Sequence, residues 1–171
     1  MTWAGSSGTG DGESRPRPPR WDLSNQLQDA EAAYALVVKR AGEWGVDTTR
    51  IGMIGFSAGA GPTEWQNYNT WYSGAVIGNA ADGKPEDLDK HSLTHLAENL
   101  QSPLLLLHGM EDTNVLFQDT VKQYRKLLQY GKGHLVELAL DPTGGHGMGG
   151  DMSNRDMHMI YYEFIKRRWR L

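Results

Sequence analysis

The sequence of 171 residues contains no cysteine. This absence excludes disulfide bonds and thiolate zinc sites, and it suits a reducing compartment or one in which reduction does not matter. The chain also lacks the apolar core of a signal peptide near its N-terminus, and no run approaches the roughly 20 apolar residues of a membrane span. We therefore expect a protein that is cytoplasmic by default and has no membrane partner.

The sequence also lacks a large excess of charge of either sign. The 17 Lys and Arg residues and 21 Asp and Glu residues leave a net charge of −4, without a basic block anywhere along the chain. A chain of this kind has no surface suited to the phosphates of nucleic acid, so we expect no nucleic-acid partner. Its composition, 39% hydrophobic and 22% charged, is ordinary for one globular domain. At this length such a domain buries about two thirds of its unfolded surface.

The first 20 residues differ in composition from the rest. Residues 1–20 contain the stretches AGSSGTGDGES and RPRPP, whose Gly, Ser and Pro content is typical of a loop. The remaining residues, 21–171, are expected to form a single domain without internal repeats. Within this domain, short apolar runs predict buried strands at residues 50–56, 74–78, 103–107 and 134–140.

Helical periodicity fills the intervals around these strands. Apolar residues three and four apart predict helices over residues 27–44, 117–128 and 157–169. Gly45 and Gly131 follow the first two of these helices as stop signals. Strands that alternate with helices, and that are apolar along their whole length, favour a mostly parallel sheet covered on both faces. The predicted fold class is therefore α/β, a three-layer sandwich.

A candidate nucleophile follows the first predicted strand. Gly55-Phe56-Ser57-Ala58-Gly59 has the form G-x-S-x-G, in which the serine stands on a sharp turn between a strand and a helix and the glycines allow close passage of the backbone. This pattern predicts Ser57 as the nucleophile and the backbone N–H of Ala58 as one oxyanion donor. The alternative is a Gly/Ser loop that merely ends a strand.

A candidate acid and a candidate base follow the third and fourth predicted strands. Glu111 and Asp112 come after the third strand, and His146 lies in a glycine-flanked loop after the fourth. The carboxyl ends of parallel strands meet at one edge of a sheet, so these side chains can approach the serine. An imidazole there can take and return a proton at neutral pH. The order serine, acid, histidine is that of α/β-hydrolases, and either carboxylate can be the acid on this argument alone.

Two patterns that suggest a cofactor or a metal are incomplete. Residues 78–84 match the start of a phosphate-binding loop, but Pro85 stands where a Ser or Thr must hold Mg²⁺. His91 and His95 are four residues apart, yet no Glu follows His91 to complete a zinc-protease motif. We therefore expect neither a cofactor nor a metal. The aromatic residues Trp3, Trp21, Trp65 and Trp71 can line a pocket, but packing in the core or at its rim is the simpler explanation for them.

Long segments resemble known hydrolase families. The segment LQDAEAAYALVVKRAGEWGVDTTRIGMIGFSAGA is similar to acetylxylan-esterase-type and carboxylesterase-type α/β-hydrolases. The segment SPLLLLHGMEDTNVLFQDTVKQYRKLLQYGKGHLVELALDPTGGHGM, with FIKRRW near the end, resembles the catalytic domain of the prolyl oligopeptidase family. The early WAGSSGTGDG is similar to a glycine-rich loop of that peptidase family. The resemblance implies Asp112, rather than Glu111, as the acid of a triad with Ser57 and His146.

The resemblance also implies an α/β-hydrolase-like sandwich and acyl-transfer chemistry. The first expectation is a serine-type peptidase of the prolyl oligopeptidase kind, with a small peptide as substrate. The alternatives are an esterase of the carboxylesterase or acetylxylan type and a catalytically silent hydrolase fragment. The family domain begins several strands earlier and supplies a second oxyanion donor there. We therefore expect an N-terminally truncated chain whose sheet is completed by a partner chain or an oligomer.

Overall fold

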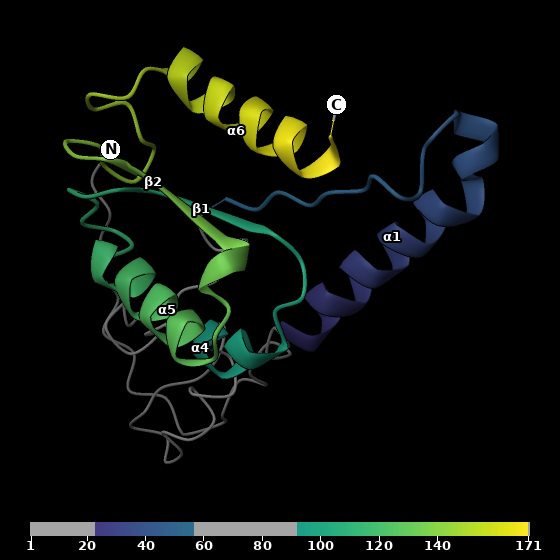
Figure 1. Cartoon of the computed structure of the whole chain (residues 1–171), viewed down its shortest axis with the longest axis horizontal. Coiled ribbons are helices and arrows are strands. Elements are labelled where there is room, and N and C mark those ends of the chain that lie inside the picture. Colours follow the sequence, from purple (N-terminus) through teal and green to yellow (C-terminus); the bar gives the residue numbers. More distant parts are fainter. Residues whose placement is uncertain (1–22, 57–91, 171) are drawn as a thin grey trace, which may run out of the picture.

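The structure, a computed structural model, describes residues 23–56 and 92–170 (Figure 1). The long helix α1, Leu23–Trp44, is followed by turns within residues 45–50 and then by an extended segment at residues 51–56. The second part begins with the short helix α4, Leu93–Leu96, and the 3-10 turn η4, Ala97–Asn99. It continues with β1, Leu104–Gly109; α5, Phe117–Gln129; η5, Gly133–Leu135; β2, Val136–Asp141; and α6, Asn154–Trp169.

The two described strands form a parallel pair. Their register runs from Leu104 opposite Val136 to Gly109 opposite Asp141, so β1 and β2 end at the same edge. The expected strands at 103–107 and 134–140 are thus confirmed, each displaced by one or two residues. Helix α5 connects them and ends before Gly131, which has a φ of +68°. A glycine is suited to that left-handed conformation because it has no Cβ.

Helices lie on both sides of the strand pair. Figure 1 shows α6 on one side of β1 and β2, and α5 with α4 on the other, which is the layered arrangement expected from the sequence. Leu127 of α5 and Ala97 of η4 are almost completely buried, at 1% and 2% exposed. On the other side, Glu137 of β2 accepts hydrogen bonds from Arg167 and Arg168 of α6 at 2.6 and 2.8 Å.

The segment at residues 51–56 differs from its prediction. It is extended, but it has no strand partner among the described residues, so the expected strand at 50–56 is not observed there. Met53, Ile54 and Phe56 are 79%, 62% and 64% exposed. An apolar run becomes a strand only when a neighbour accepts its backbone hydrogen bonds. The next predicted strand along the chain, 74–78, lies outside the described residues.

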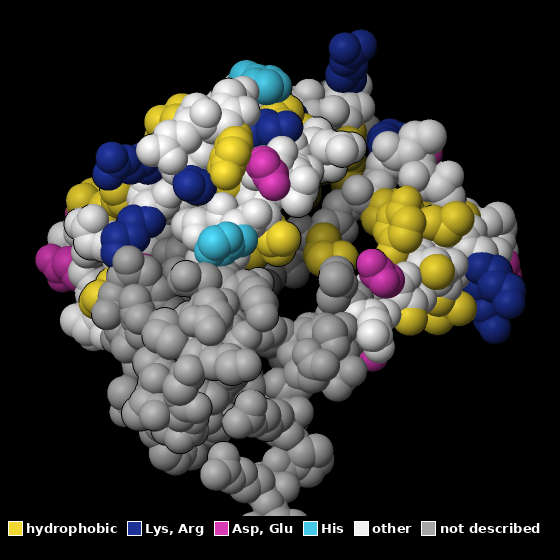
Figure 2. Space-filling view, turned by 90° about the horizontal axis from the view of Figure 1, so that it is seen from below, with side chains coloured by type: hydrophobic (Ala, Val, Ile, Leu, Met, Phe, Trp, Pro, Cys, Tyr) yellow, Lys and Arg dark blue, Asp and Glu magenta, His cyan; other side chains and the backbone are white. Residues whose placement is uncertain are grey.

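Helix α1 is where the sequence places a helix, but its apolar face is not covered. Among its residues with described side chains, 28–44, only Ala41 is buried. Tyr34 and Trp44 are 51% and 48% exposed, and Figure 2 shows apolar side chains gathered on the right, where α1 lies. The expected buried face is therefore wrong for the described part of the chain, because no described element packs along it. No described helix has the length and apolar character needed to cross a bilayer.

Candidate active site

The loops that follow β1 and β2 are connected by backbone hydrogen bonds. We call residues 110–116 the acid loop and residues 142–152 the base loop. The N–H of Met110 donates to the carbonyl of Asp141 at 2.8 Å, and the N–H of Glu111 donates to the carbonyl of Gly144 at 3.0 Å. A Cβ on Gly109 would collide with that same Gly144 carbonyl. The two loops therefore leave the sheet in direct backbone contact, which a side chain at position 109 would prevent.

The acid loop holds Asp112 in a buried position. The Asp112 side chain is only 4% exposed. Its Oδ1 accepts the N–H groups of Asn114 and Val115, each at 2.8 Å. A short carboxylate side chain suits this turn because it can reach the main chain two and three residues ahead. Both donors are part of the loop itself, so the turn fixes the carboxylate.

The second carboxylate oxygen of Asp112 faces His146. Oδ2 lies 2.9 Å from Nδ1 of His146, whose side chain is 33% exposed. Because an ionised carboxylate only accepts hydrogen bonds, Nδ1 carries the proton and donates it. The neutral imidazole then has its lone pair on Nε2. This is the tautomer that a general base needs when it takes a proton at Nε2.

Burial and hydrogen bonding oppose each other at Asp112. Burial raises the pKa of this carboxyl, but the hydrogen bonds from Val115, His146 and Asn114 outweigh it, so the pKa of Asp112 lies below its usual value. Asp112 is therefore an anion at neutral pH. An anion at this position can hold the imidazole and stabilise its positive charge after protonation.

A second histidine, His108, supports the acid loop. Its Nε2 lies 2.9 Å from the carbonyl of Val115 and 3.4 Å from Oδ2 of Asp112. Its Nδ1 lies 2.6 Å from Oγ1 of Thr120 in α5. A carbonyl only accepts, so Nε2 carries a proton here. No motif in the sequence identifies His108, although its place at the end of an apolar strand is a usable signal.

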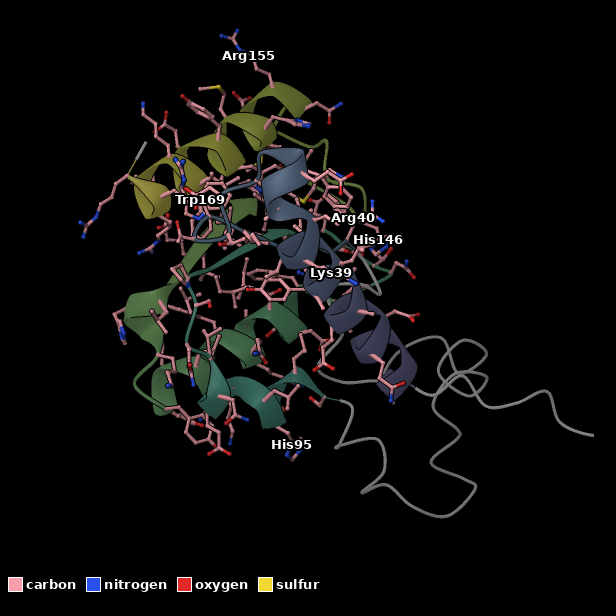
Figure 3. All side chains as sticks on the ribbon, turned by 90° about the vertical axis from the view of Figure 1, so that its right-hand side faces the viewer. Lys39, Arg40, His95, His146, Arg155 and Trp169 are labelled. Carbon is pink, nitrogen blue, oxygen red and sulfur yellow. The ribbon has the colours of Figure 1, made fainter. Side chains whose placement is uncertain are left out.

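A cavity of about 380 Å³ adjoins the pair of side chains. Asp112 and His146 line it, and so do Ile54, Gly55 and Phe56, the last described residues before Ser57. Figure 3 shows His146 on the loop that leads from β2 into α6, at the opposite end of that helix from Trp169. The chain that leads to the expected nucleophile thus reaches the same cavity as the expected acid and base.

The structure brings together two of the expected site residues. Asp112 and His146 form a hydrogen-bonded pair, whereas Glu111 is exposed and contributes its backbone N–H. Ser57 and Ala58 lie outside the described residues. So do the loop 78–84 with its Pro85, His91, and the tryptophans Trp3, Trp21, Trp65 and Trp71. Within the ranges 23–56 and 92–170, no group of three His, Asp or Glu side chains is arranged to hold a metal ion.

Comparison with known proteins gives a family match. A family model described as "Prolyl oligopeptidase family" matches residues 55–170. Among solved structures, acylaminoacyl peptidase of Pyrococcus horikoshii in an orthorhombic crystal form superposes with a TM-score of 0.67, at 24% identity over 86% of this chain. The uncomplexed enzyme of the same organism gives a TM-score of 0.53, at 28% identity over 63% of this chain.

A third structure is an acylaminoacyl peptidase in complex with Z-Gly-Gly-Phe-chloromethyl ketone. It gives a TM-score of 0.54, at 27% identity over 63% of this chain. The chain spans 19% of the uncomplexed enzyme, 27% of the enzyme in the orthorhombic form and 18% of the complexed enzyme. These likenesses confirm the expected α/β-hydrolase type of sandwich.

Proposed function

Since the chain belongs to the prolyl oligopeptidase family, we propose that it is a serine hydrolase and, more narrowly, a serine-type peptidase acting on small peptides. The observation that carries this proposal is the hydrogen bond between His146 Nδ1 and Asp112 Oδ2 at the joined ends of two parallel strands. The residues that lead into Ser57 line the same cavity as this pair.

The proposed chemistry is acyl transfer to Ser57. Neutral His146 takes the hydroxyl proton of Ser57 at Nε2 while Oγ attacks the substrate carbonyl carbon. Asp112 holds the imidazole in the required tautomer and stabilises its cation. His146 then gives the proton to the leaving amine as the C–N bond breaks. Water, deprotonated by the same His146, attacks the acyl carbon, the bond from that carbon to Ser57 Oγ breaks, and His146 returns the proton to Oγ. The N–H of Ala58 is one donor to the oxyanion in both steps.

A peptide is the substrate class that the comparisons support. The family is one of peptidases by its description, and one similar structure is a peptidase in complex with Z-Gly-Gly-Phe-chloromethyl ketone. Serine hydrolase sites also cleave activated esters, so turnover of an ester alone does not identify a peptidase. Turnover of aminoacyl anilides, measured beside short-chain aryl esters, separates the two activities.

The first test is covalent labelling of the nucleophile. A fluorophosphonate reacts with an activated serine and not with an ordinary one. Intact-mass analysis should show one adduct on the protein, and Ser57→Ala should abolish it. Ser153→Ala, which removes an exposed serine at the start of α6, is the matched control and should leave the adduct in place. A folded protein that forms no adduct would contradict the proposal.

A further inference from the structure

Asp141, the last residue of β2, has a buried carboxylate that the proposed chemistry does not use. We propose that Asp141 is a positioning residue, which fixes the base loop so that His146 meets Asp112. This inference rests on the proposed function, because it assigns a task within the same site. Its support comes from the contacts of the Asp141 side chain, the contacts of its main chain and the space around two glycines.

The carboxylate of Asp141 closes the base loop. The residue is 0% exposed. Its Oδ2 accepts the N–H of Gly150 at 2.9 Å, and its Oδ1 accepts the N–H groups of Asp151 and Met152 at 2.9 and 3.2 Å. These three donors are the last residues of the loop, before α6 begins. One side chain thus binds the end of the loop back to the residue from which the loop starts.

The main chain of Asp141 connects the base loop to the acid loop. Its carbonyl accepts the N–H of Gly144, at 3.1 Å, and the N–H of Met110, at 2.8 Å. The acid loop starts at Met110, two residues before Asp112. The residue that closes the base loop is therefore also bonded to the loop that carries the acid. A shift of Asp141 would change the distance between the two loops.

Two glycines of the base loop, Gly144 and Gly150, have no space for a side chain. A Cβ on Gly144 would lie 2.5 Å from Oδ2 of Asp141. A Cβ on Gly150 would collide with the main chain of Thr143 and Gly144. By contrast, a Cβ on Gly145 would meet nothing within 4 Å. The close packing is thus confined to the base of the loop, where the Asp141 carboxylate lies.

His146 lies in the turn above this closed base. The N–H of Met148 donates to the carbonyl of Gly145 at 3.0 Å, and Met148 has a φ of +61°, in the left-handed region. A non-glycine residue in that region is strained and persists only where its surroundings hold it. The turn that carries His146 therefore depends on the fixed base beneath it.

The charge of Asp141 suits a group surrounded by donors. Burial raises the pKa of this carboxyl, but the N–H groups of Gly150, Met152 and Asp151 hold the pKa of Asp141 below its usual value. Both carboxylate oxygens accept hydrogen bonds from main-chain N–H groups, whose direction the loop backbone fixes. An asparagine would place its NH₂ group against at least one of these donors. Asp141→Asn should consequently open the loop although it changes no volume.

The test measures the tautomer of His146. Protein labelled with ¹⁵N-histidine should show a protonated Nδ1 for His146 in the wild type, because Asp112 accepts from that nitrogen. In Asp141→Asn the His146 ring signals should change to those of an imidazole that lacks the hydrogen bond from Nδ1 to Asp112. Fluorophosphonate labelling should fall about 10²-fold, since a displacement of about 1 Å at a reacting group costs that much. The His146 signals are assigned with His146→Gln.

Two further variants separate positioning from stability. Asp156→Asn removes a carboxylate that accepts the N–H of Ser153 at 3.2 Å, immediately after the base loop. It should lower the melting temperature without changing the His146 ring signals. Gly144→Ala forces a Cβ against the Asp141 carboxylate and should reproduce the ring signals of Asp141→Asn. Gly145→Ala adds the same methyl group in open space and should retain the wild-type signals.

The outcomes decide the proposal even where one variant does not fold. If Asp141→Asn is unfolded, Gly144→Ala gives the answer. Unchanged His146 ring signals in a folded Asp141→Asn or in Gly144→Ala would overturn the positioning role. The ring signals do not depend on Ser57. Wild-type protein that shows the expected tautomer but forms no fluorophosphonate adduct would therefore contradict the proposed function and leave the role of Asp141 intact.

Discussion

Replacement of Asp112 by asparagine tests the proposed mechanism most directly. The two main-chain donors at 2.8 Å, from Asn114 and Val115, both face Oδ1. In Asp112→Asn the amide oxygen must take that place, because an NH₂ group there would face two donors. The amide NH₂ is then directed to His146, 2.9 Å from the present Oδ2. It can only donate, so Nδ1 of His146 must accept and the proton moves to Nε2.

The magnitude follows from this change of tautomer. With a proton on Nε2, His146 cannot accept the hydroxyl proton of Ser57. In serine hydrolases the corresponding replacement lowers kcat about 10⁴-fold with little change in geometry. At 1.36 kcal/mol for each factor of ten, this corresponds to about 5.4 kcal/mol of transition-state stabilisation. The bonds from the two main-chain donors remain, so we expect the variant to fold.

The assay is the rate of fluorophosphonate labelling, followed by turnover of an aminoacyl anilide. Glu111→Gln is the matched control, because Glu111 is the neighbouring carboxylate in sequence and its side chain is exposed. It should keep the wild-type rate. A labelling rate of Asp112→Asn within about tenfold of the wild type, or an equal loss in Glu111→Gln, would refute the assignment of Asp112 as the acid.

Three further predictions concern stability. Leu127→Ala removes a side chain that is 1% exposed and should lower the free energy of unfolding by about 2–5 kcal/mol in urea titrations; a loss below about 1 kcal/mol would contradict its burial. Thr120→Val removes the hydroxyl 2.6 Å from His108 Nδ1. It should lower the free energy of unfolding by about 1–3 kcal/mol in the same titrations. The hydroxyl and N–H of Thr49, with Arg50, lower the pKa of Asp47 to about 2. An Asp carboxyl in an unfolded chain has a pKa of about 3.9, so the stability that Asp47 contributes is present above about pH 4 and is lost as the pH falls toward 2. The stability difference between wild type and Asp47→Asn should shrink over that interval, and a constant difference would contradict the shift.

The predictable part of the fold is the part whose neighbours are close in sequence. The run 103–107 lies one helix away from the run 134–140, and the pair is found as parallel β1 and β2. The apolar periodicity predicts that the last helix begins at residue 157, but it begins at Asn154, because Ser153 and Asp156 form a capping box. That box was readable as a Ser followed three residues later by an acidic residue, before an apolar run.

The part that was not predictable depends on partners distant in sequence. Periodicity shows that one face of a helix is apolar, but it does not show what covers that face. Trp44 is exposed for this reason, although it lies on the apolar stripe of α1. The run 50–56 has the composition of a buried strand, yet a strand also needs a neighbour, and composition contains no information about where that neighbour is.

The candidate site shows the same division between chemistry and position. Residue types and their order predicted Ser57, His146 and a carboxylate, since these are the groups that the reaction needs. Residue type and order do not separate Glu111 from Asp112, because either carboxylate can accept a hydrogen bond from the histidine. The structure distinguishes them by the turn, in which the main-chain donors of Asn114 and Val115 are within reach of Asp112.

The approach of the two loops is encoded in residues that take no part in the chemistry. The register places Gly109 opposite Asp141, and both loops start from that pair. A side chain at Gly109 would displace the Gly144 carbonyl, and that carbonyl accepts the N–H of Glu111. Because the loops must touch before Asp112 can reach His146, a missing Cβ and a buried carboxylate determine their distance. The geometry of the acid and the base therefore depends on residues other than the two groups themselves.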